Sequence, residues 1–263
     1  MPAYYAHRRF GELVTEQLPG EMRDIIGAHR EVFLLGCQGP DIYFFYRPWS
    51  KNEVNLYGER LHDEPAKGLI ERGVKIIRRF GRESAKAAYV YGVVCHFALD
   101  SECHPYVDEM EEKLGVKHIE IEEEFEKYLM SRDGRNPFST DLSRMVPTDR
   151  KTVDAVKPLY PEMTWRQTRE SLLELRAIKK IVCQPTAGGQ ECINRLLKKA
   201  GLYEVHKGQM NQMVDNLKCL ESNAGLAARF DAAVDVATDL IDQVNEAVDG
   251  KKELGVRFER SFA

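Results

Sequence analysis

Residues 85–122 read AKAAYVYGVVCHFALDSECHPYVDEMEEKLGVKHIEIE, and this stretch decides what kind of fold the chain can form. Ser84 is a favourable N-cap, and residues 85–99, which follow it, are almost wholly apolar except at His96. Such a composition is typical of a helix that is buried on all sides. Pro105 disfavours helical backbone angles in the residue before it, so we expect this helix to end at His104.

Side chains with metal-binding chemistry recur every four residues in and after this helix. His96, Asp100 and His104 lie along one stripe, because four residues advance about 40° past a full turn and about 6 Å along the axis. His118 and Glu122 repeat the spacing on an expected second helix. The sequence therefore predicts ligand-type side chains that face a common centre between two helices.

A metal ion accounts for these groups better than a polar network does. An ionised Asp100 in a core helix is costly unless a positive charge compensates it, and His96 cannot supply that charge near neutral pH without a cost of its own. Two imidazoles and a carboxylate fill three of the four positions that zinc prefers and leave one for water. We predict a multi-zinc hydrolase. The alternatives are a buried polar network without metal, and manganese or iron in place of zinc.

The rest of the chain also reads as helical, and no segment shows sustained two-residue alternation. Thr164 and Gln167 form a capping-box pattern that opens a helix running to Val182. Two further amphipathic helices are expected over residues 210–220 and 226–248.

We therefore predict an all-α fold, in which residues 1–263 form a single compact multi-helix domain with the metal site between core helices. Residues 1–130 are expected to carry the metal site and residues 163–250 to form supporting helices. Residues 131–162 contain four prolines and are expected to make an excursion over the surface with one short helix. Residues 251–263 are expected to be a loosely held tail.

Composition argues against several classes of function. The net charge of −4 gives no basic field, so extended nucleic-acid binding is not expected. The six cysteines form no close CxxC pair and are expected to be reduced, buried thiols. Residues 1–12 show no secretion signal and no stretch has transmembrane length, so we expect a cytoplasmic protein without a membrane-spanning segment.

Three candidate ligands lie earlier in the chain, and each has an ordinary alternative. Asp41 follows Gly39 and Pro40 in a turn from which a carboxylate can point inward, although aspartate is also common in turns and at N-caps. His62 and His7 are equally compatible with surface histidines.

The order of all these residues resembles the zinc-dependent phospholipase C family and, more distantly, the fungal single-strand-specific zinc nucleases. The order runs His7, Gly39-Pro40-Asp41, His62, His96-x3-Asp100, His104 and His118-x3-Glu122. The similarity covers about the first half of the chain.

The resemblance implies a ligand set for each ion. One zinc would be held by Asp41, His62, His96 and Asp100, and a second by His104, His118 and Glu122. A third would use His7, with Asp100 bridging. In secreted members that ion is completed by the amino group and carbonyl of the processed first residue. This chain begins Met1-Pro2 and shows no leader, so two or three Zn²⁺ per chain are expected.

The resemblance also implies site roles. The family counterpart of Asp41 is a proposed base for the attacking water, so Asp41 is our candidate catalytic residue. Tyr43 opens an aromatic cluster that ends at Trp49 and either lines a headgroup pocket or packs in the core. Tyr4 and Tyr43 are the candidate substrate contacts.

The leading prediction is a metal-dependent phosphodiesterase of phospholipase C type that cleaves a phospholipid or a small glycerophosphodiester. One alternative is a nuclease or nucleotidase on the same metals. Another reads His62-Asp63 as the doublet of an HD-type phosphohydrolase, which leaves the spacing from His96 to Glu122 unexplained. A last alternative is a non-catalytic binding or sensing protein in which the metal is structural and only holds the helices together.

Overall fold

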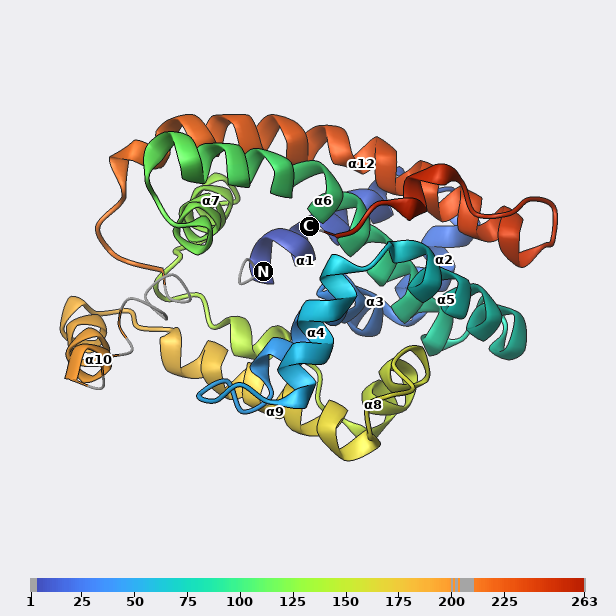
Figure 1. Cartoon of the computed structure of the whole chain (residues 1–263), viewed down its shortest axis with the longest axis horizontal. Coiled ribbons are helices and arrows are strands. Elements are labelled where there is room, and N and C mark those ends of the chain that lie inside the picture. The colour runs from blue at the N-terminus through green and yellow to red at the C-terminus, as the bar shows by residue number, and fades with distance from the viewer. Residues whose placement is uncertain (1–3, 200, 202, 204–210, 263) are drawn as a thin grey trace.

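The computed structural model describes residues 4–199, 201, 203 and 211–262, and these residues form helices and loops without a strand (Figure 1). The all-α prediction is confirmed. The α-helices are α1 (Tyr4–Gln17), α2 (Gly20–Ala28), α3 (Arg30–Gly36), α4 (Glu53–Asp63), α5 (Ala66–Phe80), α6 (Ala85–Leu114), α7 (His118–Arg132), α8 (Arg150–Val156), α9 (Trp165–Val182), α10 (Ala187–Lys199) and α12 (Leu220–Val248). The 3₁₀ helices are η1 (Gly39–Phe45), η2 (Leu142–Met145), η3 (Lys157–Leu159), η5 (Leu217–Cys219) and η6 (Val256–Glu259).

Helix α6 is the centre of the fold, and α12 lies along it in Figure 1. The Ser84 side chain accepts a hydrogen bond from the Ala87 N–H, as expected for an N-cap. Residues 87–101 are all buried, because α1, α3, α5, α7 and α12 pack around the helix. The predicted fully buried helix is therefore confirmed, and its side chains are the ones that can meet several neighbours at once.

The predicted end of this helix at His104 is wrong. Helix α6 continues through Pro105 to Leu114 and ends where Gly115 adopts φ 61°. Beyond the proline, Val107 and Met110 are each only 1% exposed. Their burial offsets the missing proline N–H, which alone does not end a helix that has tertiary support.

Two glycines let α3 and α6 approach backbone to backbone. A Cβ at Gly36 would lie closer than 3.0 Å to the Tyr89 carbonyl oxygen, and a Cβ at Gly92 would meet the Phe33 carbonyl oxygen in the same way. This contact holds the end of α3 against α6. Because η1 follows α3 directly, Asp41 is brought beside the polar stripe of α6.

The predicted helices 164–182 and 226–248 are confirmed as α9, with its capping box at Thr164, and as part of α12. The predicted helix over 210–220 is wrong where it can be compared, since residues 211–216 are irregular and Met210 lies outside the described residues. The backbone N–H of Gln212 donates to the Glu123 carboxylate. That of Asn216 donates to Glu124 Oε1 at 3.0 Å. Side chains of α7 thus take the donors that a helix would have used internally.

Two segments pack more deeply than the sequence indicated. Residues 131–162 form η2, α8 and η3, and they bury Tyr160 completely. The C-terminal segment is not a loose tail, because Phe258 and Phe262 are both 0% exposed. Leu254 is also buried, so these three apolar side chains, spread along the segment, all enter the core.

The cysteines are free thiols, as expected, but they are not all buried. Cys37, Cys95, Cys103 and Cys219 are buried, whereas Cys192 is exposed on α10. None of the described helices combines the length and the apolar character that crossing a membrane requires.

Candidate metal centre

The structure brings the predicted ligand residues together from different helices. They are His7 on α1, Asp41 on η1, His62 on α4, His96, Asp100 and His104 on α6, and His118 and Glu122 on α7. All of them except His118 are buried, and the His118 side chain is 32% exposed. Among the described residues, the predicted ligands form three groups of three, two of which share His96, and a fourth group joins the exposed Asp108 and the half-buried Glu111 to His118.

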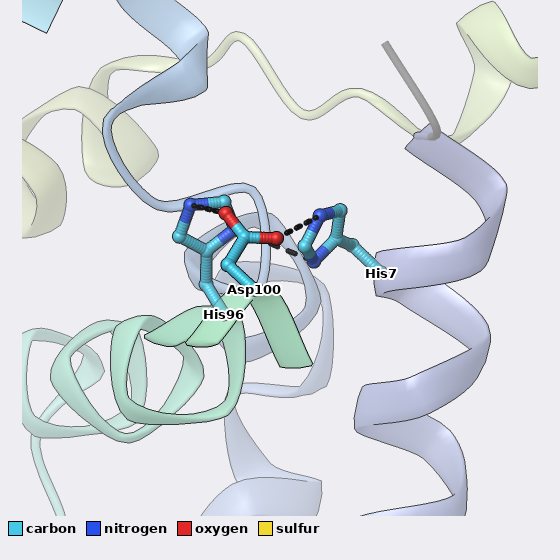
Figure 2. Close-up of side chains that lie close together, drawn as sticks. All are labelled: His7, His96 and Asp100. Carbon is cyan, nitrogen blue, oxygen red and sulfur yellow. Dashed lines mark hydrogen bonds and ion pairs between the residues drawn. The ribbon is translucent and has the colours of Figure 1, made fainter. Parts of the chain in front are cut away.

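The first group is His7, His96 and Asp100, drawn in Figure 2. The Asp100 carboxylate lies between the two imidazoles, with Oδ1 3.2 Å from His7 Nε2 and Oδ2 3.1 Å from His96 Nε2. The ring centroids of His7 and His96 are 4.5 Å apart. A side chain from the first helix therefore meets the stripe on α6, as a bridging Asp100 requires.

The second group, here called the inner group, is Asp41, His62 and His96. Asp41 Oδ1 lies 2.7 Å from His62 Nε2 and 3.8 Å from His96 Nε2. Gly39 makes this approach possible, because it has φ 50° and a Cβ there would lie closer than 3.0 Å to the His96 ring.

The third group, here called the outer group, is His104, His118 and Glu122. Glu122 Oε1 lies 2.8 Å from His118 Nε2 and 3.6 Å from His104 Nε2. His104 Nε2 is also 3.9 Å from Asp100 Oδ1. Asp100 thereby connects the outer group to the other two.

Hydrogen bonds at Nδ1 orient three of the histidines. His62 Nδ1 lies 2.8 Å from the Gly58 carbonyl oxygen, and His96 Nδ1 lies 3.2 Å from the Cys37 carbonyl oxygen. A carbonyl can only accept, so each Nδ1 carries the proton and Nε2 presents its lone pair to the centre. His118 Nδ1 lies 2.9 Å from Asp108 Oδ1, and its Nε2 also points inward.

The residues fit a metal, because their buried ligand atoms satisfy no partner at hydrogen-bonding geometry. Within the part of the chain that the structure describes, this holds for Nε2 of His7, His62, His96 and His104, for both Asp100 oxygens and for Glu122 Oε2. These atoms lie within ion-pair distance of one another yet do not point along donor–acceptor lines. Buried polar atoms are normally paired, so a cluster of this kind calls for a cation between them.

The electrostatics of the inner region show the same need for a cation. Burial lowers the pKa of His96 to about 3, so its imidazole is neutral at pH 7. Burial acts to raise the pKa of Asp100, but the histidines around it, His96 first, hold that pKa well below its usual value. Asp41 follows the same pattern, with a lowered pKa despite its burial. Two anionic carboxylates thus flank a neutral imidazole.

The outer group balances its charges differently. Burial acts to lower the pKa of His104, but the negative charges of Asp100 and Glu122 raise it to about 9. Burial acts to raise the pKa of Glu122, yet the interactions with the neighbouring imidazoles of His104 and His118 bring it to about 2. Metal binding at this group has to displace a proton from His104, because only a neutral imidazole is a ligand.

An open cavity of about 700 Å³ adjoins the outer group, within the size range of small-molecule sites. Its lining residues are Phe44, Glu59, His62, Asp63, His104, Glu111, Lys117, His118, Ile119 and Glu122. The Phe44 ring stacks on His62 with centroids 5.0 Å apart. The candidate centre is therefore reachable from solvent on this side.

The predicted substrate contacts Tyr4 and Tyr43 do not line this cavity. Tyr43 is 0% exposed and its hydroxyl lies 3.2 Å from that of Thr168, while the Tyr4 hydroxyl donates to the Met145 carbonyl oxygen at 2.8 Å. Both rings pack in the core, so neither borders the cavity, and their role as substrate contacts stays a prediction. Phe44, which is half-buried, is the member of the aromatic cluster that lines the cavity.

Sequence reasoning missed two residues that touch the ligands. Asp108 contacts His118 and lies four residues after His104, so it extends the interval of four in α6 and could have been found by that signal. Phe262 contacts His62 and His96, and no local pattern links it to them. Met1 and Pro2, considered above for the third ion, lie outside the described residues.

The HD reading of His62-Asp63 finds no support in the geometry. His62 belongs to the inner group, whereas Asp63 is exposed and belongs to none of the metal-type groups among the described residues. Asp63 follows its neighbour by one residue on a helix, so the two side chains face different directions.

A family model described as zinc-dependent phospholipase C matches residues 6–171 of the chain. All the predicted ligand residues lie within this range. Comparisons with curated proteins and with solved structures give no significant match.

Proposed function

This chain belongs to the zinc-dependent phospholipase C family, and we propose that it hydrolyses the phosphodiester bond of a phospholipid or a small glycerophosphodiester on the metal centre described above. One observation carries the proposal. Buried imidazole and carboxylate atoms from α1, α4, α6 and α7 converge without hydrogen-bond geometry on one centre beside an open cavity. We propose zinc as the metal, with two or three ions per chain.

When bound, zinc supplies a Lewis acid that polarises the phosphoryl oxygens and lowers the pKa of water. The chain's own residues then have separate tasks. Asp41 stays ionised because its pKa is depressed, so its carboxylate is available both as a ligand and to accept the proton of the attacking water. The Gly58 carbonyl keeps His62 Nε2 directed at Asp41, and the complete burial of His96 keeps bulk water from the back of the centre.

The cavity favours a small phosphodiester over a nucleic acid. Apart from the inner and outer groups, the cavity is lined by three acidic side chains and one basic one. The acidic side chains are Glu59, Asp63 and Glu111, and the basic one is Lys117. An acidic rim repels the repeated charges of a polynucleotide, which needs a basic groove. A single zwitterionic headgroup carries no net charge and avoids this repulsion.

The test combines metal content with substrate choice. Protein purified without chelator is expected to contain two or three zinc ions per chain by elemental analysis. It is expected to release a phosphorylated headgroup from a short-chain phosphatidylcholine and to leave single-stranded DNA intact. Preferred cleavage of DNA would support the nuclease alternative instead. A chain that contains no divalent metal would overturn the proposal.

A further inference from the structure

The segment from Leu254 to Phe262, here called the C-terminal strap, lies outside the range of the family match and yet reaches the metal centre. In Figure 1 the red segment turns back from the far end of α12 and ends in the middle of the molecule, over α6. Phe258 and Phe262 are both completely buried. The strap is therefore part of the core around the site, and its contacts show what it does there.

The strap backbone is bonded to the connection between α4 and α5. The Phe262 N–H donates to the carbonyl oxygen of His62 at 3.1 Å, so one of these bonds is made to a ligand residue itself. The Ala66 N–H donates to the Arg260 carbonyl oxygen at 2.9 Å. The two bonds hold the end of α4, and with it the backbone that carries His62, at a fixed distance from the strap.

The Phe262 ring lies against both histidines of the inner group. Its centroid is 5.7 Å from that of His62 and 5.5 Å from that of His96. It also meets Phe97, which neighbours His96 on α6, at 5.3 Å in an edge-to-face arrangement. One apolar ring thus limits the tilt of two imidazoles that come from different helices.

Charged contacts tie the strap to α6 near the remaining ligands. Arg257 donates to Glu102 Oε1, and Arg260 lies 3.4 Å from the same oxygen. Glu102 stands between Asp100 and His104 in the sequence of α6. The strap consequently spans from α4 to α6, the two helices that supply the inner histidines.

We propose that the C-terminal strap is a positioning element of the inner group, in which Phe262 fixes the directions of His62 and His96 for metal binding. The proposal rests on the proposed metal centre but not on the identity of the substrate. Phe262 acts through the two histidines and offers no ligand atom of its own, so its role is comparable to that of outer-shell partners of metal ligands.

Phe258 offers a matched control. It has the same residue type, the same strap and the same complete burial, and its ring contact is with Phe97 at 5.6 Å. Phe262→Ala and Phe258→Ala are compared with the unmodified chain by titrating the metal-free proteins with Zn²⁺ against a fluorescent chelator. Thermal unfolding of each metal-free protein measures the general loss of packing.

Phe262→Ala is expected to weaken the binding of one zinc ion about 10- to 100-fold, the usual effect of losing an outer-shell partner. Phe258→Ala is expected to lower the unfolding temperature similarly but to keep zinc affinity within about threefold of the unmodified chain, because it leaves the histidines covered. Phe262→Leu, which keeps most of the volume, is expected to recover most of the affinity.

Equal losses of zinc affinity in the two alanine variants would overturn the proposal, since the strap would then act only through stability. If the alanine variants do not fold, Phe262→Leu and Phe258→Leu repeat the comparison with the same criteria. An unmodified chain that binds zinc but cleaves no phospholipid would refute the proposed function and leave this proposal standing. An unmodified chain that binds no zinc would refute both.

Discussion

The inner and outer groups each combine two imidazoles with one carboxylate but are held in place by different means. The inner histidines, His62 and His96, are at most 7% exposed and hydrogen-bond to backbone carbonyls. The outer His118 faces the cavity and is oriented by the exposed side chain of Asp108. The fold itself therefore fixes the inner group, whereas the outer group depends on side chains that solvent can reach.

We therefore expect the two groups to have different roles in catalysis. The inner group contains the candidate base Asp41 and packs against the C-terminal strap, with His62 as its residue at the cavity, so we expect its geometry to be set before any substrate arrives. The outer group borders the cavity and is placed to receive the substrate. We expect a chelator to remove an ion from the outer group first, because that ion has the shorter path to solvent.

The largest effect is expected at Asp100, because the inner and outer groups share this carboxylate. This carboxylate lies 3.1 Å from His96 and 3.9 Å from His104, so it serves both groups. Asp100→Asn removes the shared negative charge and is expected to lower the zinc content at both groups. The rate of hydrolysis is expected to fall by more than about 100-fold, beyond the usual effect of an outer-shell change. Elemental analysis and a phospholipid assay measure the two losses.

Asp24→Asn, which changes an exposed aspartate on α2, is the control for Asp100→Asn and should leave both measurements unchanged. If Asp100→Asn kept its full zinc content, Asp100 would be a structural aspartate. The two groups would then be independent rather than bridged.

A glycine substitution separates the inner group from the outer one. Gly39→Ala places a Cβ against the His96 ring at a residue with φ 50°, so it combines a steric clash with backbone strain. We expect a loss of about 2–5 kcal/mol in the free energy of unfolding, from about 1–3 kcal/mol of overpacking and about 1–2 kcal/mol of strain. One zinc ion, that of the inner group, should be lost.

The matched control is Gly134→Ala, because Gly134 has φ 69° but nothing within 4 Å of an added Cβ. It is expected to cost only the strain, about 1–2 kcal/mol, with zinc content unchanged. Denaturant unfolding and elemental analysis of the two variants make the comparison. Equal zinc content in both would show that the η1 backbone does not set the inner geometry.

How much of this could be predicted from the sequence depends on whether the signal is local. The stripe of His96, Asp100 and His104 follows from helical spacing alone, and the cap at Ser84 and the capping box at Thr164 are equally local. Bringing Asp41 to this stripe depends on the close contact between α3 and α6, which spacing does not reveal. Here only the family resemblance identified the residue.

The expectations that failed concern segments whose conformation is decided by distant partners. Pro105 lies inside α6 because Val107 and Met110 have a core to enter. Phe258 and Phe262 looked like part of a tail because their partners are more than a hundred residues away on α4 and α6. A short window contains no information about such contacts.

A smaller effect is expected at the outer group from Asp108→Asn. Asp108 lies 2.9 Å from His118 Nδ1, so its carboxylate orients the ring and increases the basicity of Nε2. We expect the affinity for one zinc ion to fall about tenfold, at the low end for outer-shell partners because the pair is exposed. Zinc titration against a chelator measures it.

Glu111→Gln is the control for Asp108→Asn, since Glu111 lies 4.0 Å from the same nitrogen, beyond hydrogen-bonding distance. It is expected to change zinc affinity by less than about twofold, as a surface substitution does. Equal effects of the two variants would mean that general negative charge, rather than orientation of His118, supports the outer group.

The smallest effect is expected at Asp63, the exposed neighbour of His62. Asp63 lines the cavity but belongs to neither the inner nor the outer group. Asp63→Ala is expected to leave zinc content and kcat unchanged and to change KM by no more than about twofold, the range of ordinary surface substitutions. Glu59→Ala, one turn earlier on α4 and facing the same cavity, should behave alike. Loss of both zinc and turnover in Asp63→Ala, but not in Glu59→Ala, would favour the HD-type chemistry, because only the HD-type scheme uses the Asp63 carboxylate as a metal ligand. The assignment of two groups joined through Asp100 would then be wrong.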